Sequence, residues 1–165
     1  MTVDEQDLQH LRRCVQLAAE AVQAGDEPFG SVLVDATGVV LMEDRNRVGC
    51  GDHTRHPEIA IAKWAATNMS PGDRASSTVY TSGEHCPMCA AAHAWVGLGR
   101  IVYASSAQQL TSWSHEFGAP VSPVAPLPIQ QVAPGIRVEG PVDELAGQVR
   151  ELHRTLHRGS SDSEH

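Results

Sequence analysis

Two short segments constrain the fold of this chain more than any other feature: His56-Pro57-Glu58 and Cys86-Pro87-Met88-Cys89. Each proline stands at the first residue of a predicted helix, where the missing N–H of proline costs nothing. A residue that precedes proline is pushed out of the α region, so His56 and Cys86 become helix caps. The pattern therefore predicts two helices in adjacent units of the fold, each beginning at a potential metal ligand.

Strand and helix patterns alternate around these segments. Two apolar runs at 31–34 and 39–42 flank a turn-rich tetrapeptide, which is typical of a β-hairpin. Residues 43–55 are polar and are predicted as a loop. Hydrophobic spacing predicts helices at 5–24, 57–68, 87–97 and 141–157, and strands at 78–81 and 101–104. Strands that alternate with helices in this way favour an α/β layer arrangement.

The pattern weakens after residue 105. Residues 118–135 hold five prolines, so regular structure is not expected there, apart from a short edge strand at 129–132 or 136–138. The 165 residues correspond to one domain, which we place at 1–158. Residues 159–165, which are rich in Ser, Asp and Glu, are predicted to form a disordered tail.

Charge and hydropathy exclude some functions. The formal net charge of −8 disfavours a general nucleic-acid binder, which needs basic side chains to neutralise phosphates. The one basic stripe, Arg150, Arg154 and Arg158, is interpreted as a solvated helix face. The N-terminus lacks an export signal and the chain lacks a long apolar run, so we expect a cytoplasmic protein without a membrane span.

The cysteine spacing points to metal chemistry. Cys14 and Cys50 are expected to be ordinary thiols, whereas Cys86 and Cys89 occupy the N-cap and N3 positions of one helix. Thiols there deprotonate more easily, because the helix N-terminus is positive. With His56 they provide three ligands for Zn²⁺ and leave a fourth tetrahedral position open for water, as in catalytic sites. Glu58 follows His56 by two residues, so it can approach that water without ligating the metal and can move its proton.

This spacing resembles the H-x-E and P-C-x-x-C motifs of the cytidine deaminase superfamily. Other segments are similar to its guanine deaminase and tRNA adenosine deaminase branch, and the resemblance covers roughly residues 5–110. These segments are Pro28-Phe29-Gly30-Ser31-Val32, Asn46, Tyr80-Thr81-Ser82 and Ile101-Val102-Tyr103-Ala104.

The resemblance implies a three-layer α/β/α fold with a mixed sheet of about five strands, bound Zn²⁺ and usually a homodimer. It implies hydrolytic attack on an amidine-like ring carbon with release of ammonia. By matching position, Asn46 resembles the asparagine that hydrogen-bonds the substrate ring, and Phe29 a residue that packs beside it. Glu116 lies in the late segment where guanine deaminase-like members carry an acidic group that senses the amino group of the base.

One departure concerns the residue before the first cysteine, which is His85 where the family usually has proline. His85 is expected near the pocket rim, where it either contacts substrate or replaces a rigid turn. This departure puts the identity of the substrate in doubt, not zinc binding.

Several functions stay open at this stage. The leading hypothesis is deamination of a small free heterocycle such as guanine, a related purine base or a nucleoside, in a pocket that residues 118–135 cover. The alternatives are deamination of adenosine in tRNA and deamination of cytosine or cytidine. A zinc-stabilised binding module would leave Glu58 without a purpose, and a thioredoxin-like Cys86/Cys89 pair would leave both His56 and Glu58 unexplained.

Overall fold

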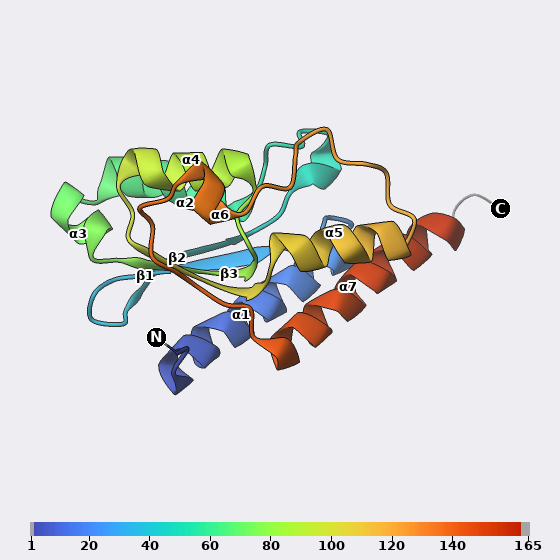
Figure 1. Cartoon of the computed structure of the whole chain (residues 1–165), viewed down its shortest axis with the longest axis horizontal. Helices are drawn as coiled ribbons and strands as arrows, with labels where there is room; N and C mark the ends of the chain where they lie inside the picture. Colours follow the sequence, from blue (N-terminus) through green and yellow to red (C-terminus); the bar gives the residue numbers. More distant parts are fainter. Residues whose placement is uncertain (1, 163–165) are drawn as a thin grey trace.

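A mixed five-stranded sheet separates two layers of helices in the computed structural model, which describes residues 2–162 (Figure 1). The strand order is β2-β1-β3-β4-β5; β1 is antiparallel to β2 and β3, whereas β4 is parallel to β3 and β5. This is the expected three-layer α/β/α fold. The strands are β1 (Gly30–Val34), β2 (Val40–Arg45), β3 (Thr78–Gly83), β4 (Arg100–Ser105) and β5 (Val138–Glu139).

The helices divide between the two faces of the sheet. On one face lie α1 (Glu5–Gln23), α5 (Ala107–Glu116) and α7 (Asp143–Asp162). On the other lie α2 (Pro57–Asn68), α4 (Pro87–Val96) and the short α6 (Ile129–Val132), with α3 (Pro71–Ala75) after α2 (Figure 1). A 3₁₀ turn, η1 (Val48–Cys50), interrupts the loop between β2 and α2.

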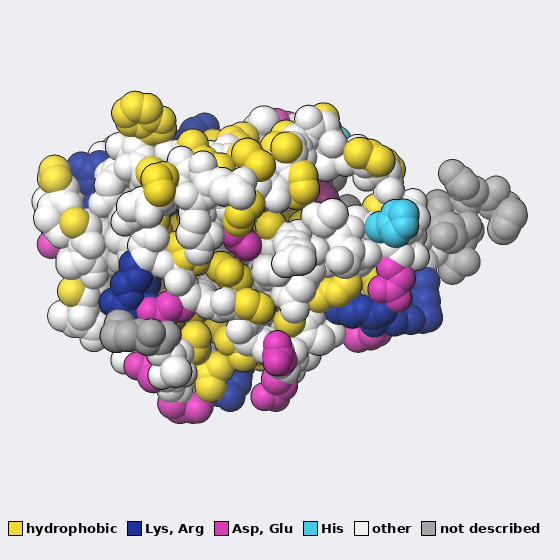
Figure 2. Space-filling view, in the orientation of Figure 1, with side chains coloured by type: hydrophobic (Ala, Val, Ile, Leu, Met, Phe, Trp, Pro, Cys, Tyr) yellow, Lys and Arg dark blue, Asp and Glu magenta, His cyan; other side chains and the backbone are white. Residues whose placement is uncertain are grey.

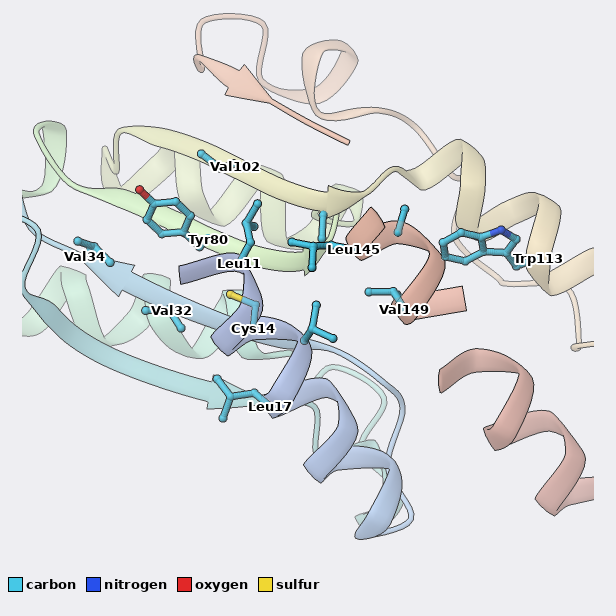
Figure 3. Close-up of a cluster of buried hydrophobic side chains, with 13 residues drawn as sticks. Leu11, Cys14, Leu17, Val32, Val34, Tyr80, Val102, Trp113, Leu145 and Val149 are labelled. Atoms are coloured by element: carbon cyan, nitrogen blue, oxygen red, sulfur yellow. The ribbon is translucent and has the colours of Figure 1, made fainter. Parts of the chain in front are cut away.

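Alternating side chains of the strands build a core on each face, because successive strand residues point to opposite sides. Val32 and Tyr80 lie in the core with Leu11 of α1 and Val149 of α7 (Figure 3). The intervening residues pack against the other layer. Leu33 and Val79 contact α2, and Ile101 and Tyr103 contact α4 and α6 through Ala90 and Ile129.

A buried charge cluster ties the N-terminal helix to the parallel half of the sheet. Asp4 and Asp7 form a capping box at the start of α1. Asp7 is buried and accepts hydrogen bonds from Tyr80 (2.6 Å) and Arg100 (2.8 and 2.9 Å). Arg100 also pairs with Glu139 of β5. A buried ion pair of this kind is costly to break from one side, because it leaves the other charge unpaired.

The ends of most predicted helices and strands are confirmed within one to three residues, and the exceptions lie in the late part of the chain. The strand suggested at 129–132 is wrong, because Ile129–Val132 form α6 and the edge strand lies at 138–139. Helix α5 lies where no element is predicted from the sequence, and Ser106 and Gln109 form a capping box at its start. Helix α7 runs to Asp162, past the predicted beginning of the tail at Gly159, and residues 163–165 lie outside the described residues. Among the helices of residues 2–162, none combines the length and hydrophobicity that a bilayer crossing needs.

Candidate active site

Two helix starts bring the three predicted metal ligands together. His56 caps α2 and Cys86 caps α4, both in extended conformation, and proline follows each of them. The Nδ1 atom of His56 lies 3.5 Å from Sγ of Cys86 and 3.6 Å from Sγ of Cys89. Tetrahedral zinc with ordinary Zn–N and Zn–S bonds would separate these atoms by about 3.6 Å. The three side chains therefore fit one Zn²⁺ ion.

The electrostatics of this cluster favour a thiolate. Hydrogen bonding from the Cys89 thiol, and then from His56, holds the pKa of Cys86 well below its usual range. The same contact with Cys86 raises the pKa of His56 to about 9. Cys86 also stands at the N-terminus of α4, where the helix dipole favours negative charge. A ligand set that already stabilises negative sulfur suits a divalent cation.

Glu58 is buried beside the ligands, in the first turn of α2. Its Oε1 atom accepts hydrogen bonds from the hydroxyl of Thr81 (2.7 Å) and from that of Ser31 (3.2 Å). Ser31 and Thr81 are directly opposite each other on β1 and β3, so the sheet presents both hydroxyls to the helix. Burial raises the pKa of Glu58. A carboxyl group with a raised pKa is suited to both taking and giving a proton.

Asn46, at the start of the loop that ends at His56, offers a buried hydrogen-bond donor. Its side chain is 1% exposed, and its Oδ1 atom accepts from the backbone N–H groups of Glu27 (3.3 Å) and Val48 (3.1 Å). Its Nδ2 atom has no hydrogen-bond partner within residues 2–162. The backbone N–H of Arg47 donates to the carbonyl of Arg55 (3.0 Å), so Asn46 and His56 flank a closed loop. Because a buried polar group without a partner is costly, the free Nδ2 indicates a place for a ligand acceptor.

The Phe29 ring lies against the strand that leads to the cysteine motif. A Cβ atom at Gly83 would lie 3.0 Å from the ring, so a larger residue there would require the ring to shift. The ring also makes an edge contact with His153 of α7, with centroids 5.4 Å apart. The Phe29 carbonyl also accepts the N–H of Asn46 (2.9 Å). The backbone of Phe29 is thus bonded to Asn46 while its ring packs at the end of β3.

The structure does not place His85 and Glu116 as the sequence suggested. His85 is buried, with 1% of its surface exposed, instead of lying at a rim. Its ring stands edge-on to His93, with centroids 5.4 Å apart, and both its nitrogens lack a partner among the described residues. The metal-ligand group comprises His56, Cys86 and Cys89, without His85. Glu116 is exposed at the end of α5 and pairs with Arg150 of α7.

Comparison with known proteins shows which family this sequence is similar to. Residues 4–105 match the model of the cytidine and deoxycytidylate deaminase zinc-binding region. A probable cytosine deaminase of Schizosaccharomyces pombe is 34% identical over 117 residues, which cover 70% of this chain and 70% of the relative. The tRNA-specific adenosine deaminase of Haemophilus influenzae is 33% identical over 103 residues, covering 62% of this chain and 60% of the relative.

A third relative is similar in both sequence and structure. The guanine deaminase of Bacillus subtilis is 36% identical over 97 residues, covering 58% of this chain and 62% of the relative. Its X-ray structure superposes with a TM-score of 0.54 at 27% identity, covering 77% of this chain and 89% of that chain. The matched part of this chain thus spans 60–70% of the length of the three relatives. Since the family model includes His56, Glu58, Cys86 and Cys89 and more than half of the residues, the chain belongs to the cytidine and deoxycytidylate deaminase family of zinc-dependent hydrolytic deaminases.

Proposed function

We propose that this protein deaminates a small free amino-heterocycle, with guanine or a related purine base or nucleoside as the leading candidate. The observation that carries the proposal is the buried Nδ2 of Asn46, which has no hydrogen-bond partner among the described residues and is separated from the ligand His56 by the closed loop 47–55. Because its Oδ1 is already occupied, Asn46 can only donate, and it requires an acceptor atom on the substrate. Ring nitrogens and ring carbonyl oxygens of nucleobases provide such acceptors.

His56, Cys86 and Cys89 would hold Zn²⁺, which supplies the Lewis acidity that brings the pKa of water towards neutrality. The proton transfers belong to Glu58. Its Oε1 is fixed by Thr81 and Ser31, so the carboxylate approaches the reacting atoms in one orientation. It can accept a proton from the attacking water and deliver it to a ring nitrogen or to the departing amine. The water oxygen then becomes the new carbonyl oxygen, and the former amino group leaves as ammonia.

We propose that Phe29 packs beside the ring and that residues 118–135 cover the pocket. Residues 117–128, all of them described, form neither helix nor strand, and Val121 is 96% exposed there. A cover that moves should become less accessible when substrate binds. Limited proteolysis with and without the substrate tests this role, and equal cleavage rates would contradict it.

The charge distribution supports a small substrate over tRNA. Arg150 pairs with Glu116, and Arg154 lies 3.4 Å from Glu151. Both guanidinium groups also stack on the ring of Phe117. Cations that are engaged in this way are poorly placed to neutralise phosphates, on which nucleic-acid affinity depends. Salt-dependent binding of tRNA would argue for the RNA substrate instead.

Cytosine is the second candidate, because the alignment with the cytosine deaminase of S. pombe covers the largest share of this chain among the three relatives. One experiment separates the candidates. Ammonia release by the zinc-loaded protein is measured with guanine, adenine, cytosine, their nucleosides, triazines and tRNA. Activity on one free base that Glu58→Gln abolishes, while zinc stays bound, would support the proposal. One zinc per chain with no activity on any of these compounds would point to an amino-heterocycle outside this set, and His85 would then be the first residue to examine.

We also propose that the protein forms a homodimer through the outer face of α4. Trp95 is 89% exposed and borders a groove of about 540 Å³, which Ala91, Leu98 and Ile136 also line. Hydrophobic side chains gather over α4 and α6 on this face (Figure 2). No charged residue lines the groove, so two acidic chains could meet there without charge repulsion. Because the tryptophan and the groove share one face, a twofold axis could seat each Trp95 on its partner.

A further inference from the structure

A single carboxylate connects the metal-binding turn with two other helices. Glu84 directly follows β3 and precedes Cys86 by two residues. Its Oε1 atom accepts the N–H of Ala107 (2.9 Å) and its Oε2 atom accepts the N–H of Ile129 (2.8 Å), the first residues of α5 and α6. The Glu84 backbone N–H donates to the carbonyl of Ser105 (2.8 Å), at the end of β4. Helix N-termini leave N–H groups unpaired and favour negative charge, so Glu84 satisfies both helix starts.

These two helices bracket the exposed Pro-rich segment 117–128. The hydrogen bonds within the segment are local, such as the one from the N–H of Leu127 to the carbonyl of Ala125 (2.8 Å). Its position is therefore set by its ends. Ile129, at the far end, is completely buried and packs in one cluster with Ala90, the residue after Cys89. Ile129 is thus held at two points near the cysteine motif. Its backbone N–H is bonded to Glu84, which precedes the motif in sequence, and its side chain packs with Ala90, which follows the motif.

We propose that Glu84 is a positioning residue that fixes the segment 117–128 relative to Cys86 and Cys89, so that the segment closes over a bound base in register with the metal site. This inference rests on the proposed function and adds to it a residue that touches neither the substrate nor the metal. Two N–H donors need two acceptor oxygens, which a carboxylate has and an amide lacks. In Glu84→Gln the NH2 of the side-chain amide would face one of the two backbone N–H groups, so that two donors would meet.

This requirement gives a sharp test with three variants: Glu84→Gln, Ala107→Pro and the double variant. Ala107 is the first residue of α5, where proline is favoured, and Ser106 already has the extended conformation that precedes proline. Ala107→Pro removes one N–H donor, so a glutamine at 84 can satisfy Ile129 with its single oxygen. We expect Glu84→Gln to raise KM about tenfold, with kcat changed less than about threefold. The double variant should return to within about threefold of Ala107→Pro alone.

Two further readouts separate positioning from general loss of structure. Zinc content should stay at that of the unaltered protein in all three variants. Amide hydrogen exchange at Ile129 should be about tenfold faster in Glu84→Gln and should recover in the double variant. An unchanged KM in Glu84→Gln, a KM increase that Ala107→Pro fails to rescue, or loss of zinc would each overturn the proposal. If the unaltered protein deaminates no compound, the proposed function fails, while the exchange at Ile129 still decides whether Glu84 holds α6.

Discussion

Thr81 donates a 2.7 Å hydrogen bond to Oε1 of Glu58, across the contact between β3 and α2. Thr81 is fully buried and pairs in register with Ser31, whose hydroxyl reaches the same carboxylate oxygen. The carboxylate that we propose to move protons is thus hydrogen-bonded by two strands of the sheet, although it belongs to α2. Because both hydroxyls are fixed in strands, the carboxylate is held in position before a substrate arrives, which is how enzymes reduce the cost of reorganisation during the reaction.

This orientation predicts the effect of Thr81→Val, which removes the hydroxyl and nearly preserves the volume. We expect kcat to fall about tenfold or more, because a hydrogen bond to a charged group contributes roughly 1.5–3 kcal/mol. Zinc content should not change, since the hydrogen bonds of Thr81 go to Glu58, Ser31 and the backbone and not to the three metal ligands. Steady-state kinetics and metal analysis check both expectations. Thr78→Val, at the opposite end of β3, is the matched control, and equal kcat values in the two variants would rule out the orienting role.

The metal site could be predicted from the sequence because its parts are local. Proline at the first helical position defines each helix start, and the spacing within each motif places His56, Glu58, Cys86 and Cys89 without knowledge of the rest of the fold. The partners of Glu58 could not be predicted in this way. Ser31 and Thr81 are 50 residues apart, and their shared role depends on the register between β1 and β3. Register is fixed by packing and not by a local signal.

The late part of the chain shows the same limit. Ile129–Val132 has the composition of a strand, but the N–H of Ile129 is bonded to Glu84, 45 residues away, and the segment forms a helix. His85 is predicted at the rim because it takes the place of the family proline before Cys86, yet its ring is buried beside His93. In both cases the contacts that determine the structure come from other parts of the chain, so neither the helix at 129–132 nor the burial of His85 can be predicted from one segment alone.

The burial of His85 predicts that an apolar ring is tolerated in its place. Replacing a buried polar group that lacks a partner by an apolar group of similar shape is nearly neutral or stabilising. We therefore expect His85→Phe to leave the free energy of unfolding unchanged or to raise it by about 1 kcal/mol, as measured by urea denaturation. His93→Phe is the matched control, because it breaks the 2.7 Å hydrogen bond to the carbonyl of Gly99 and should be destabilising. A loss of about 2 kcal/mol or more in His85→Phe would mean that its ring nitrogens bind a partner.

The pH dependence of stability follows from His153. Its ring is buried against Phe29 and Trp113, and burial lowers its pKa to about 3. Above the unfolded pKa of about 6.5 both states are neutral, so His153 has no effect on stability. As the pH falls below 6.5, the unfolded chain binds a proton that the folded protein does not bind until about pH 3. Stability is therefore lost on acidification, by at most about 1.4 kcal/mol per pH unit from this group.

The corresponding measurement is the free energy of unfolding between pH 6 and pH 4 at constant ionic strength. We expect His153→Phe to flatten its decline, because phenylalanine binds no proton in either state. His115→Phe is the control, since His115 is exposed on α5. If the decline is as steep in His153→Phe as in His115→Phe, then His153 does not contribute to acid sensitivity.

The proposed dimer makes Trp95 the residue to test. Trp95 follows Cys89 by six residues on α4, so a partner chain that covers it would also support the helix that carries both cysteines. A tryptophan that fills a pocket is often worth 2 kcal/mol or more in an interface, which corresponds to a dissociation constant about thirtyfold higher on its loss. We expect sedimentation velocity to show a dimer for the unaltered protein and a shift towards monomer for Trp95→Ser. Val121→Ser removes an equally exposed apolar side chain outside the groove and should leave the dimer intact. A monomeric unaltered protein at micromolar concentration, or equal dissociation of the two variants, would show that α4 is not the contact.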